Sequence, residues 1–157
     1  MSPTPTPPSS SSTTPTTAQR LSQITSQMST PAKPPVTCHI LDTTIGRPAQ
    51  NVKCTLLVFA STTSPAIASE ATVLATGLTN SDGRVTAWDT AETGKALVLQ
   101  EGAAYKMRFE VEEYFARTAQ ETFFPYVEIA FRVRSTGEHY HIPLLLAGWS
   151  YSTYRGS

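Results

Sequence analysis

The chain has 157 residues, 39% of them hydrophobic, and its 12 basic and 12 acidic side chains give a formal net charge of zero. This length suits one domain, and a near-neutral chain without a basic stripe excludes a nucleic-acid-binding function. No apolar run approaches the roughly 20 residues of a membrane helix, and the N-terminus lacks the apolar core of a secretory signal, so we expect a soluble, intracellular protein with no membrane partner.

The first 35 residues differ in composition from the rest of the chain. Pro, Ser and Thr fill 24 of these positions, and Arg20 and Lys33 are the only charged side chains. Such a segment has too little apolar surface to offset the entropy of ordering it. We therefore predict a disordered segment over residues 1–35 and a single folded domain over residues 36–157.

Alternating apolar and polar residues dominate the chain after residue 36. In one example, Tyr105, Met107 and Phe109 share a face from which the intervening Lys106 and Arg108 point away. This period of two is typical of half-buried strands. We predict strands over residues 36–43, 51–60, 71–79, 103–111, 127–133 and 139–149.

Turn residues separate these strands. Residues 80–83 read NSDG, residues 135–138 read STGE, and a further turn follows Gly46. Such sequences favour hairpin turns. Residues 112–120 instead begin with acidic residues and contain good helix formers, which predicts one short helix. The pattern as a whole favours an all-β fold, an antiparallel β-sandwich.

Two cysteines lie in predicted strands. Cys38 and Cys54 have no Cys-x-x-Cys partner. In a reducing compartment such residues act as small core side chains, so we expect no disulfide.

The three histidines are the main candidates for chemistry. His139 and His141 lie two residues apart on one strand, so their side chains point to the same side, and His39 lies in the first strand. A single strand histidine is commonly structural or exposed, but three in so short a domain suggest a site. Together they suit a zinc site with three histidine ligands and an open position for water.

The same residues also suit a reaction without a metal. A neutral imidazole can take a proton from water near physiological pH, because its unperturbed pKa is about 6.5. Arg84, directly after the NSDG turn, and Arg155, near the end of the chain, offer planar guanidinium groups for a carbonyl or an oxyanion. An arginine after a turn is also commonly a solvated surface residue. The residues alone leave these alternatives open.

Five motifs resemble the 5-hydroxyisourate hydrolases of the transthyretin-like family. They read CHILDTTIGRPA, TNSDGR, FFPYVEIAF, HYHIPLLL and YSTYRGS, at residues 38–49, 79–84, 123–131, 139–146 and 151–157. The resemblance covers residues 36–157 and none of the first 35. One departure is LLAGW at residues 145–149, where the family often has Ser-Pro before its aromatic residue.

The resemblance implies a transthyretin-like β-sandwich of two four-stranded sheets with one short helix. It also implies a homotetramer, built as a dimer of dimers, and hydrolysis of 5-hydroxyisourate to 2-oxo-4-hydroxy-4-carboxy-5-ureidoimidazoline in urate degradation, with no cofactor. The catalytic residues carried over by motif are His39, Arg84 and His141. The substrate-binding set adds the terminal Tyr154, Arg155, Gly156 and Ser157, and His139 takes a supporting role.

Three classes of function follow from these residues. They are a metal-free hydrolase, a zinc-dependent hydrolase that uses all three histidines, and a non-catalytic transthyretin-like protein that binds a small molecule. The histidines and the terminal motif favour a hydrolase over a carrier. The fold by itself serves both.

A short segment of the N-terminal region resembles a type-2 peroxisomal targeting signal. Arg20–Met28 reads RLSQITSQM, and Leu21, Ile24 and Met28 fall on one helical face that suits a receptor groove. The segment predicts a peroxisomal protein with an import receptor as a partner, and cytoplasmic residence is the alternative.

Overall fold

The computed structural model describes residues 33–60 and 70–156. The Arg20–Met28 signal and Ser157 lie outside these residues, as does the predicted disordered segment 1–35 apart from its last three positions. The predictions for those parts stay predictions. Within the described part, no helix has the length and apolar character needed to cross a membrane.

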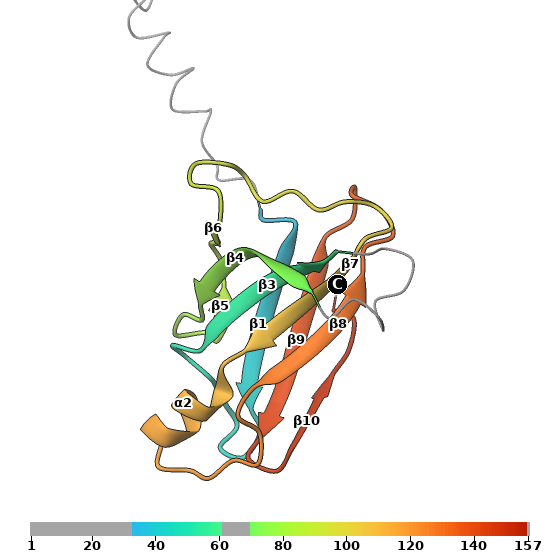
Figure 1. Ribbon diagram of the computed structural model, residues 1–157. Helices are drawn as coiled ribbons and strands as arrows, with labels where there is room; N and C mark the ends of the chain where they lie inside the picture. Colours follow the sequence, from blue (N-terminus) through green and yellow to red (C-terminus); the bar gives the residue numbers. More distant parts are fainter. Residues whose placement is uncertain (1–32, 61–69, 157) are drawn as a thin grey trace, which may run out of the picture. The chain divides into compact units, whose positions relative to one another are not determined.

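The described chain forms two β-sheets packed face to face (Figure 1). Sheet A has the order β10 (Ser150–Thr153), β9 (Tyr140–Ala147), β1 (Val36–Asp42) and β2 (Arg47–Pro48), and β5 (Arg84–Val85) also pairs with β1. Sheet B has the order β6 (Asp89–Thr90), β4 (Ala71–Leu78), β3 (Lys53–Phe59), β7 (Ala104–Phe109) and β8 (Val127–Arg132). The predicted β-sandwich is confirmed.

Two details differ from the expected antiparallel sandwich of four-stranded sheets. Each sheet contains five strands: sheet A has three longer strands and the two-residue strands β2 and β5, and sheet B has four longer strands and the two-residue strand β6. The pair β1 and β9 is parallel, whereas the other pairs are antiparallel. Parallel neighbours need a long connection. Here all of sheet B lies between β1 and β9 in the sequence.

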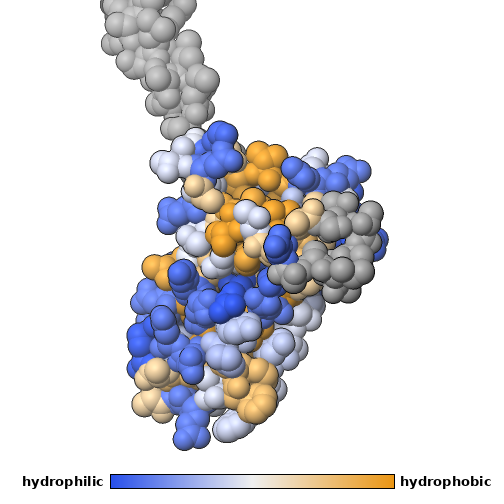
Figure 2. Space-filling model, viewed as in Figure 1, coloured by the Kyte–Doolittle hydropathy of each residue, from blue (hydrophilic) through white to orange (hydrophobic). Residues whose placement is uncertain are grey.

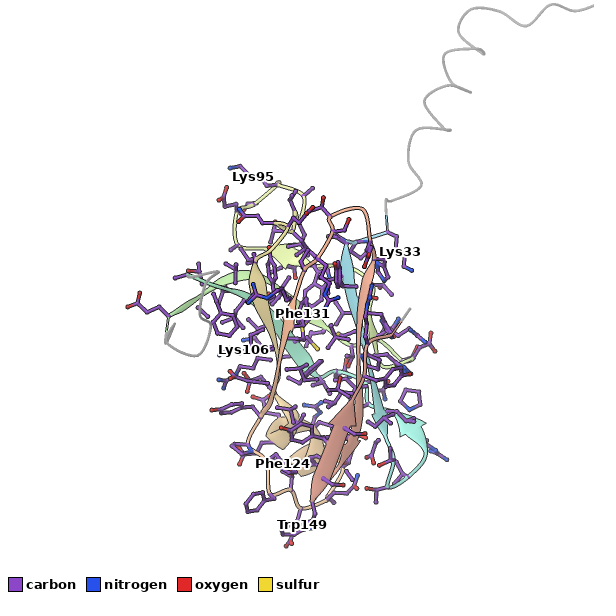
Figure 3. All side chains as sticks on the ribbon, turned by 90° about the vertical axis from the view of Figure 1, so that its right-hand side faces the viewer. Lys33, Lys95, Lys106, Phe124, Phe131 and Trp149 are labelled. Carbon is purple, nitrogen blue, oxygen red and sulfur yellow. The ribbon has the colours of Figure 1, made fainter. Side chains whose placement is uncertain are left out.

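The core lies between the sheets, where side chains from both fill the space (Figure 3). The period of two is confirmed: β1 buries alternate residues, and Tyr105, Met107 and Phe109 of β7 are all buried. Cys38 and Cys54 are buried free thiols whose Sγ atoms lie 3.8 Å apart across the two sheets. The expectation of core cysteines without a disulfide is confirmed.

The outer face of sheet B carries a group of ion pairs. Glu128 of β8 pairs with Lys106 and Arg108 of β7, at 3.0 and 3.5 Å. In the view of Figure 2, hydrophilic side chains spread over the middle of the molecule and apolar ones gather nearer its upper end. All three histidines belong instead to sheet A or to the residue that precedes β9.

The predicted short helix is confirmed as α2 (Val111–Arg117). Glu112 and Glu113 lie in its first turn, where acidic side chains favour the helix dipole, and Tyr114 and Phe115 are buried. The helix ends three residues before the predicted boundary. Ala119 has a φ of 54°, which a continuing helix does not allow.

A buried carboxylate ties α2 to the end of β1. Asp42 is fully buried, and its Oδ2 accepts hydrogen bonds from the Tyr114 hydroxyl at 2.9 Å and from the Gln120 amide at 3.2 Å. Its Oδ1 accepts from the backbone N–H of Thr44 at 2.9 Å. Burial and the Asp42 contact raise the pKa of Tyr114, so this hydroxyl keeps its proton and remains a donor.

We predict that Tyr114→Phe lowers the free energy of unfolding by about 1–3 kcal/mol, because buried Asp42 loses a donor. Urea denaturation measures this difference. Tyr126→Phe is the matched control, since the Tyr126 ring is 41% exposed and its contact with Arg108 uses the ring face. Equal stability of the two variants would contradict the role of Asp42.

Candidate active site

His39 and Arg84 meet on the outer face of sheet A. Strand β1 buries every second residue, so Thr37, His39 and Leu41 point away from the core. In the antiparallel pairing of β1 with β5, His39 lies directly opposite Arg84. Opposed residues of antiparallel strands project to the same face. The first strand therefore presents an imidazole beside a guanidinium.

The NSDG turn holds Arg84 in this position. The Asn80 side chain accepts hydrogen bonds from the backbone N–H groups of Asp82 and Arg84, at 2.9 and 3.0 Å. Gly83 has a φ of 69°, and its carbonyl accepts from Ile40 of β1 at 2.9 Å. A Cβ at residue 83 would lie 2.4 Å from the Ile40 carbonyl oxygen. Only glycine permits this approach of the turn to β1.

His141 lies on the same outer face, on the other side of β1. The parallel pairing of β1 with β9 sets Thr37 opposite His141. The Thr37 hydroxyl lies 2.9 Å from His141 Nδ1 and 2.9 Å from His139 Nε2. The two histidines therefore share a side, as the sequence predicted, and contact one hydroxyl.

The chain end is tied to His141. The backbone N–H of Gly156 donates to the His141 carbonyl at 3.1 Å, and a Cβ at residue 156 would lie 2.4 Å from His141 Cδ2. Arg155 forms an ion pair with Glu138, and its guanidinium lies 5.7 Å from the centre of the Tyr140 ring. These contacts tie Arg155 and Gly156 to β9 and to the residues just before it.

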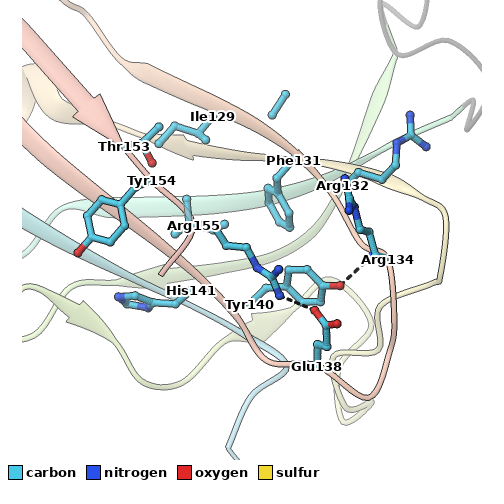
Figure 4. Close-up of a pocket in the computed structure, with 12 residues that line it drawn as sticks. Ile129, Phe131, Arg132, Arg134, Glu138, Tyr140, His141, Thr153, Tyr154 and Arg155 are labelled. Atoms are coloured by element: carbon cyan, nitrogen blue, oxygen red, sulfur yellow. Dashed lines mark hydrogen bonds and ion pairs between the residues drawn. The ribbon is translucent and has the colours of Figure 1, made fainter. Parts of the chain in front are cut away.

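We call residues 154–156 the tail. A pocket of about 430 Å³ opens beside it (Figure 4). Its lining includes His141, Tyr154 and Arg155 together with Glu138 and Tyr140. His39 and Arg84 are not among the residues that line it. The chain thus brings His39, Arg84 and His141 to one face, but of these three only His141 lines the pocket. Ser157 lies outside the described residues.

The electrostatics favour neutral histidines. Burial and then the neighbouring Arg84 lower the pKa of His39, while a hydrogen bond to the Asp82 backbone and the Asp82 charge act in the opposite direction. Burial, followed by the charges of its neighbours, also lowers the pKa of His141; these neighbours are Arg84, His39, His139 and Lys33. At neutral pH both imidazoles are therefore in the form that accepts a proton.

The geometry does not support the zinc alternative. Over residues 33–60 and 70–156, no group of three His, Cys, Asp or Glu side chains is placed to hold a metal ion. The facing nitrogens of His139 and His141 are directed at the Thr37 hydroxyl instead of at a common open point.

Thr37 and Asn80 complete the site, and sequence reasoning did not assign them a role. A signal existed for each: the period of two sets Thr37 on the face of His39, and Asn80 opens the NSDG motif. The partners of Thr37 were hidden because they lie 102 and 104 residues further along the sequence, whereas Asn80 binds residues of its own turn.

This architecture is shared with a known protein family. Residues 36–156 match the HIUase/Transthyretin family. The chain belongs to this family. The predicted family resemblance is confirmed.

The proteins that this chain resembles include 5-hydroxyisourate hydrolases and a transthyretin. A probable 5-hydroxyisourate hydrolase of Schizosaccharomyces pombe is 43% identical over 81% of this chain and 94% of its own length. The solved 5-hydroxyisourate hydrolase of Klebsiella pneumoniae is 30% identical, with a TM-score of 0.58 over 78% of this chain and 98% of its own. Sea bream transthyretin, solved with thyroxine, is 25% identical, with a TM-score of 0.62 over 78% and 94%. Fold similarity alone does not separate these two kinds of protein, whereas sequence identity is higher for the hydrolases.

We predict that Gly156→Ala lowers kcat/KM for the substrate of this site by about 10², because the added methyl group displaces the His141 ring and small misplacements have effects of this size. The melting temperature should stay unchanged, since Gly156 lies at the chain end. Gly137→Ala is the matched control, because the nearest atom to its new Cβ, Ser135 Oγ, is 3.7 Å away. Wild-type activity in Gly156→Ala would show that the tail does not position His141.

Proposed function

We propose that this member of the HIUase/Transthyretin family hydrolyses 5-hydroxyisourate to 2-oxo-4-hydroxy-4-carboxy-5-ureidoimidazoline, a step of urate degradation. The observation that carries the proposal is the meeting of His39, Arg84 and His141 on one face of sheet A. The names of the Schizosaccharomyces pombe and Klebsiella pneumoniae relatives support the same substrate. A carrier needs neither a neutral base nor a guanidinium beside it.

The substrate is a small, oxygen-rich bicycle, so its site needs hydrogen-bond donors and a base. In the proposed reaction, His39 or His141 takes a proton from water, and the water oxygen attacks the lactam carbonyl carbon. Arg84 stabilises the negative charge that develops on the carbonyl oxygen. The carbon–nitrogen bond then breaks, the ring nitrogen leaves the carbonyl carbon and takes a proton, and the carbonyl carbon becomes a carboxylate that stays attached to the product.

The rate enhancements expected from these side chains match what the hydrolysis requires. General base catalysis accelerates a reaction by about 10² to 10⁴, and one oxyanion donor contributes about 10² to 10³. Because the substrate already hydrolyses unaided, rate enhancements of this size are enough for it. No covalent intermediate is needed. The three side chains are therefore sufficient without a cofactor.

The tail supplies the substrate-binding part of the proposal. Tyr154 is 60% exposed and lines the pocket with Arg155 and His141. We assign Tyr154 to contact with the planar ligand and Arg155 to its polar rim. Because His39 and Arg84 lie outside the pocket of one chain, a second copy in the predicted homotetramer would enclose them. The homotetramer and the peroxisomal location both stay predictions.

We predict that the protein removes the absorbance of freshly generated 5-hydroxyisourate faster than buffer does. His39→Ala and His141→Ala should each lower kcat by about 10² or more, because each removes an imidazole from the reacting face. Substrate that disappears at the buffer rate would favour the non-catalytic binding protein. Activity lost on chelation and restored by zinc would favour the zinc-dependent hydrolase.

We predict that Arg84→Gln changes both rate and pH dependence. Activity requires a neutral base, so it falls as the pH drops through the lowered histidine pKa, below the usual value of about 6.5. Removing the Arg84 charge raises the pKa of His39 and His141, so the acid limb of kcat/KM moves to higher pH. The loss of the oxyanion donor lowers kcat by about 10² to 10³.

Arg47→Gln is the matched control for this profile. Arg47 is an exposed arginine of the same sheet, on β2, and is not among the charges that act on either histidine. An acid limb that stays in place in Arg84→Gln would contradict the proposed contact of the guanidinium with the base.

A further inference from the structure

One hydroxyl lies between two histidines beside the proposed reacting face. Thr37 Oγ1 is 2.9 Å from His139 Nε2 and 2.9 Å from His141 Nδ1, and all three residues are half-buried. Thr37 is set opposite His141 by the β1–β9 register, and His139 directly precedes β9. The three side chains form a continuous hydrogen-bonded row along the outer face of sheet A.

The protonation of His139 is coupled to that of His141 through the single proton of the Thr37 hydroxyl. A threonine hydroxyl has one proton to donate and lone pairs to accept with, and a neutral imidazole has one N–H and one bare nitrogen. Thr37 can donate to only one of its two histidine partners and must accept from the other. When both rings are neutral, a proton on His141 Nδ1 therefore requires a bare His139 Nε2, and the reverse also holds.

We propose that Thr37 is a positioning residue that makes His141 Nε2 the general base and joins His139 to it as a proton relay. The proposal rests on the hydrolase function proposed above and deepens it. In the resting state, His141 Nδ1–H donates to Thr37, and the Thr37 hydroxyl donates to His139 Nε2. The opposite ring atom of His141, Nε2, then carries the lone pair.

A backbone contact of His139 supports this direction of the hydrogen bonds, from His141 through Thr37 to His139. His139 hydrogen-bonds to the backbone of Pro34, which has no N–H, so the Pro34 carbonyl accepts a ring proton of His139. With Nε2 turned to Thr37, that proton belongs on Nδ1. Nε2 of the neutral ring is then bare and accepts the Thr37 hydroxyl proton.

The charges around the row favour moving a proton away from His141. Burial lowers the pKa of both rings. After burial, the charges of Arg84, His39, His139 and Lys33 lower the pKa of His141, whereas Lys33 lowers the pKa of His139 and a hydrogen bond to the Pro34 backbone raises it. A positive charge on His141 is therefore opposed by Arg84. The same charge on His139 meets Lys33 but not the Arg84 guanidinium.

Each proton that moves in the relay has a donor and an acceptor. His141 Nε2 takes a proton from the attacking water, the Nδ1 proton of His141 passes to the Thr37 oxygen, and the Thr37 hydroxyl proton passes to His139 Nε2. His141 is then neutral and His139 carries the charge. In the reverse direction, His139 Nε2 returns a proton to the Thr37 oxygen and the Thr37 hydroxyl returns one to His141 Nδ1. The proton that His141 Nε2 took from water then passes to the leaving ring nitrogen, and all three residues are back in their resting state.

The test compares Thr37→Val, which removes the hydroxyl but keeps the shape, with Thr37→Ser, which keeps the hydroxyl. We expect Thr37→Val to lower kcat for 5-hydroxyisourate by about 10² with little change in KM, since a general base is lost, and Thr37→Ser to restore most of the rate. Thr43→Val is the matched control, because the Thr43 hydroxyl binds the Leu146 carbonyl at the far end of β1.

A second measurement needs no turnover. Nitrogen-15 NMR of histidine-labelled protein reports which ring nitrogen carries the proton, and we expect the Nδ1–H form of His141 in wild type and in Thr37→Ser. Thr37→Val should lose this preference and change the pH titration of His139 and His141 together. A wild-type kcat and an unchanged His141 tautomer in Thr37→Val would overturn the proposal while leaving the hydrolase function intact. If the wild-type protein turns over no 5-hydroxyisourate, the proposed function fails, and the NMR result still decides whether Thr37 couples the rings.

Discussion

The pairing of β1 with β5 on one side and with β9 on the other is the constraint on which this site depends. It sets His39 opposite Arg84 and Thr37 opposite His141. The register is held by the buried alternate residues of β1, because a shift by one position would turn Cys38 to the surface and His39 into the core. The chemistry of the outer face is therefore secured by the packing of the inner one.

Two glycines bring polypeptide backbone close to this arrangement. Gly83 lets the turn before Arg84 contact the Ile40 carbonyl of β1, and Gly156 lets the chain end lie against the His141 ring. In both places a side chain would meet an atom 2.4 Å away. The Gly residues of the DGR and YRGS motifs thus serve close approach, which places the guanidinium and the tail within reach of the histidines.

Arg84 plays two parts that reinforce each other. Beside His39 and His141 it lowers the pKa of both rings, which keeps them neutral and able to accept a proton. The same guanidinium is the donor that an oxyanion on the substrate needs. In the proposed reaction, one positive charge therefore prepares the base before the reaction and stabilises the charge that forms during it.

Local patterns in the sequence determined much of this protein, and long-range pairing decided the rest. The period of two placed the six strands β1, β3, β4, β7, β8 and β9 and set His39 on the face of Thr37. Early acidic residues marked the helix, and the five motifs identified the candidate residues. The parallel pairing of β1 with β9 and the buried contact of Asp42 with Tyr114 were beyond such patterns. So was the Thr37 bridge between His139 and His141. Periodicity reports which face of a strand is buried, whereas the choice of neighbouring strand depends on packing across the whole domain, so only the tertiary structure brings these distant residues into contact.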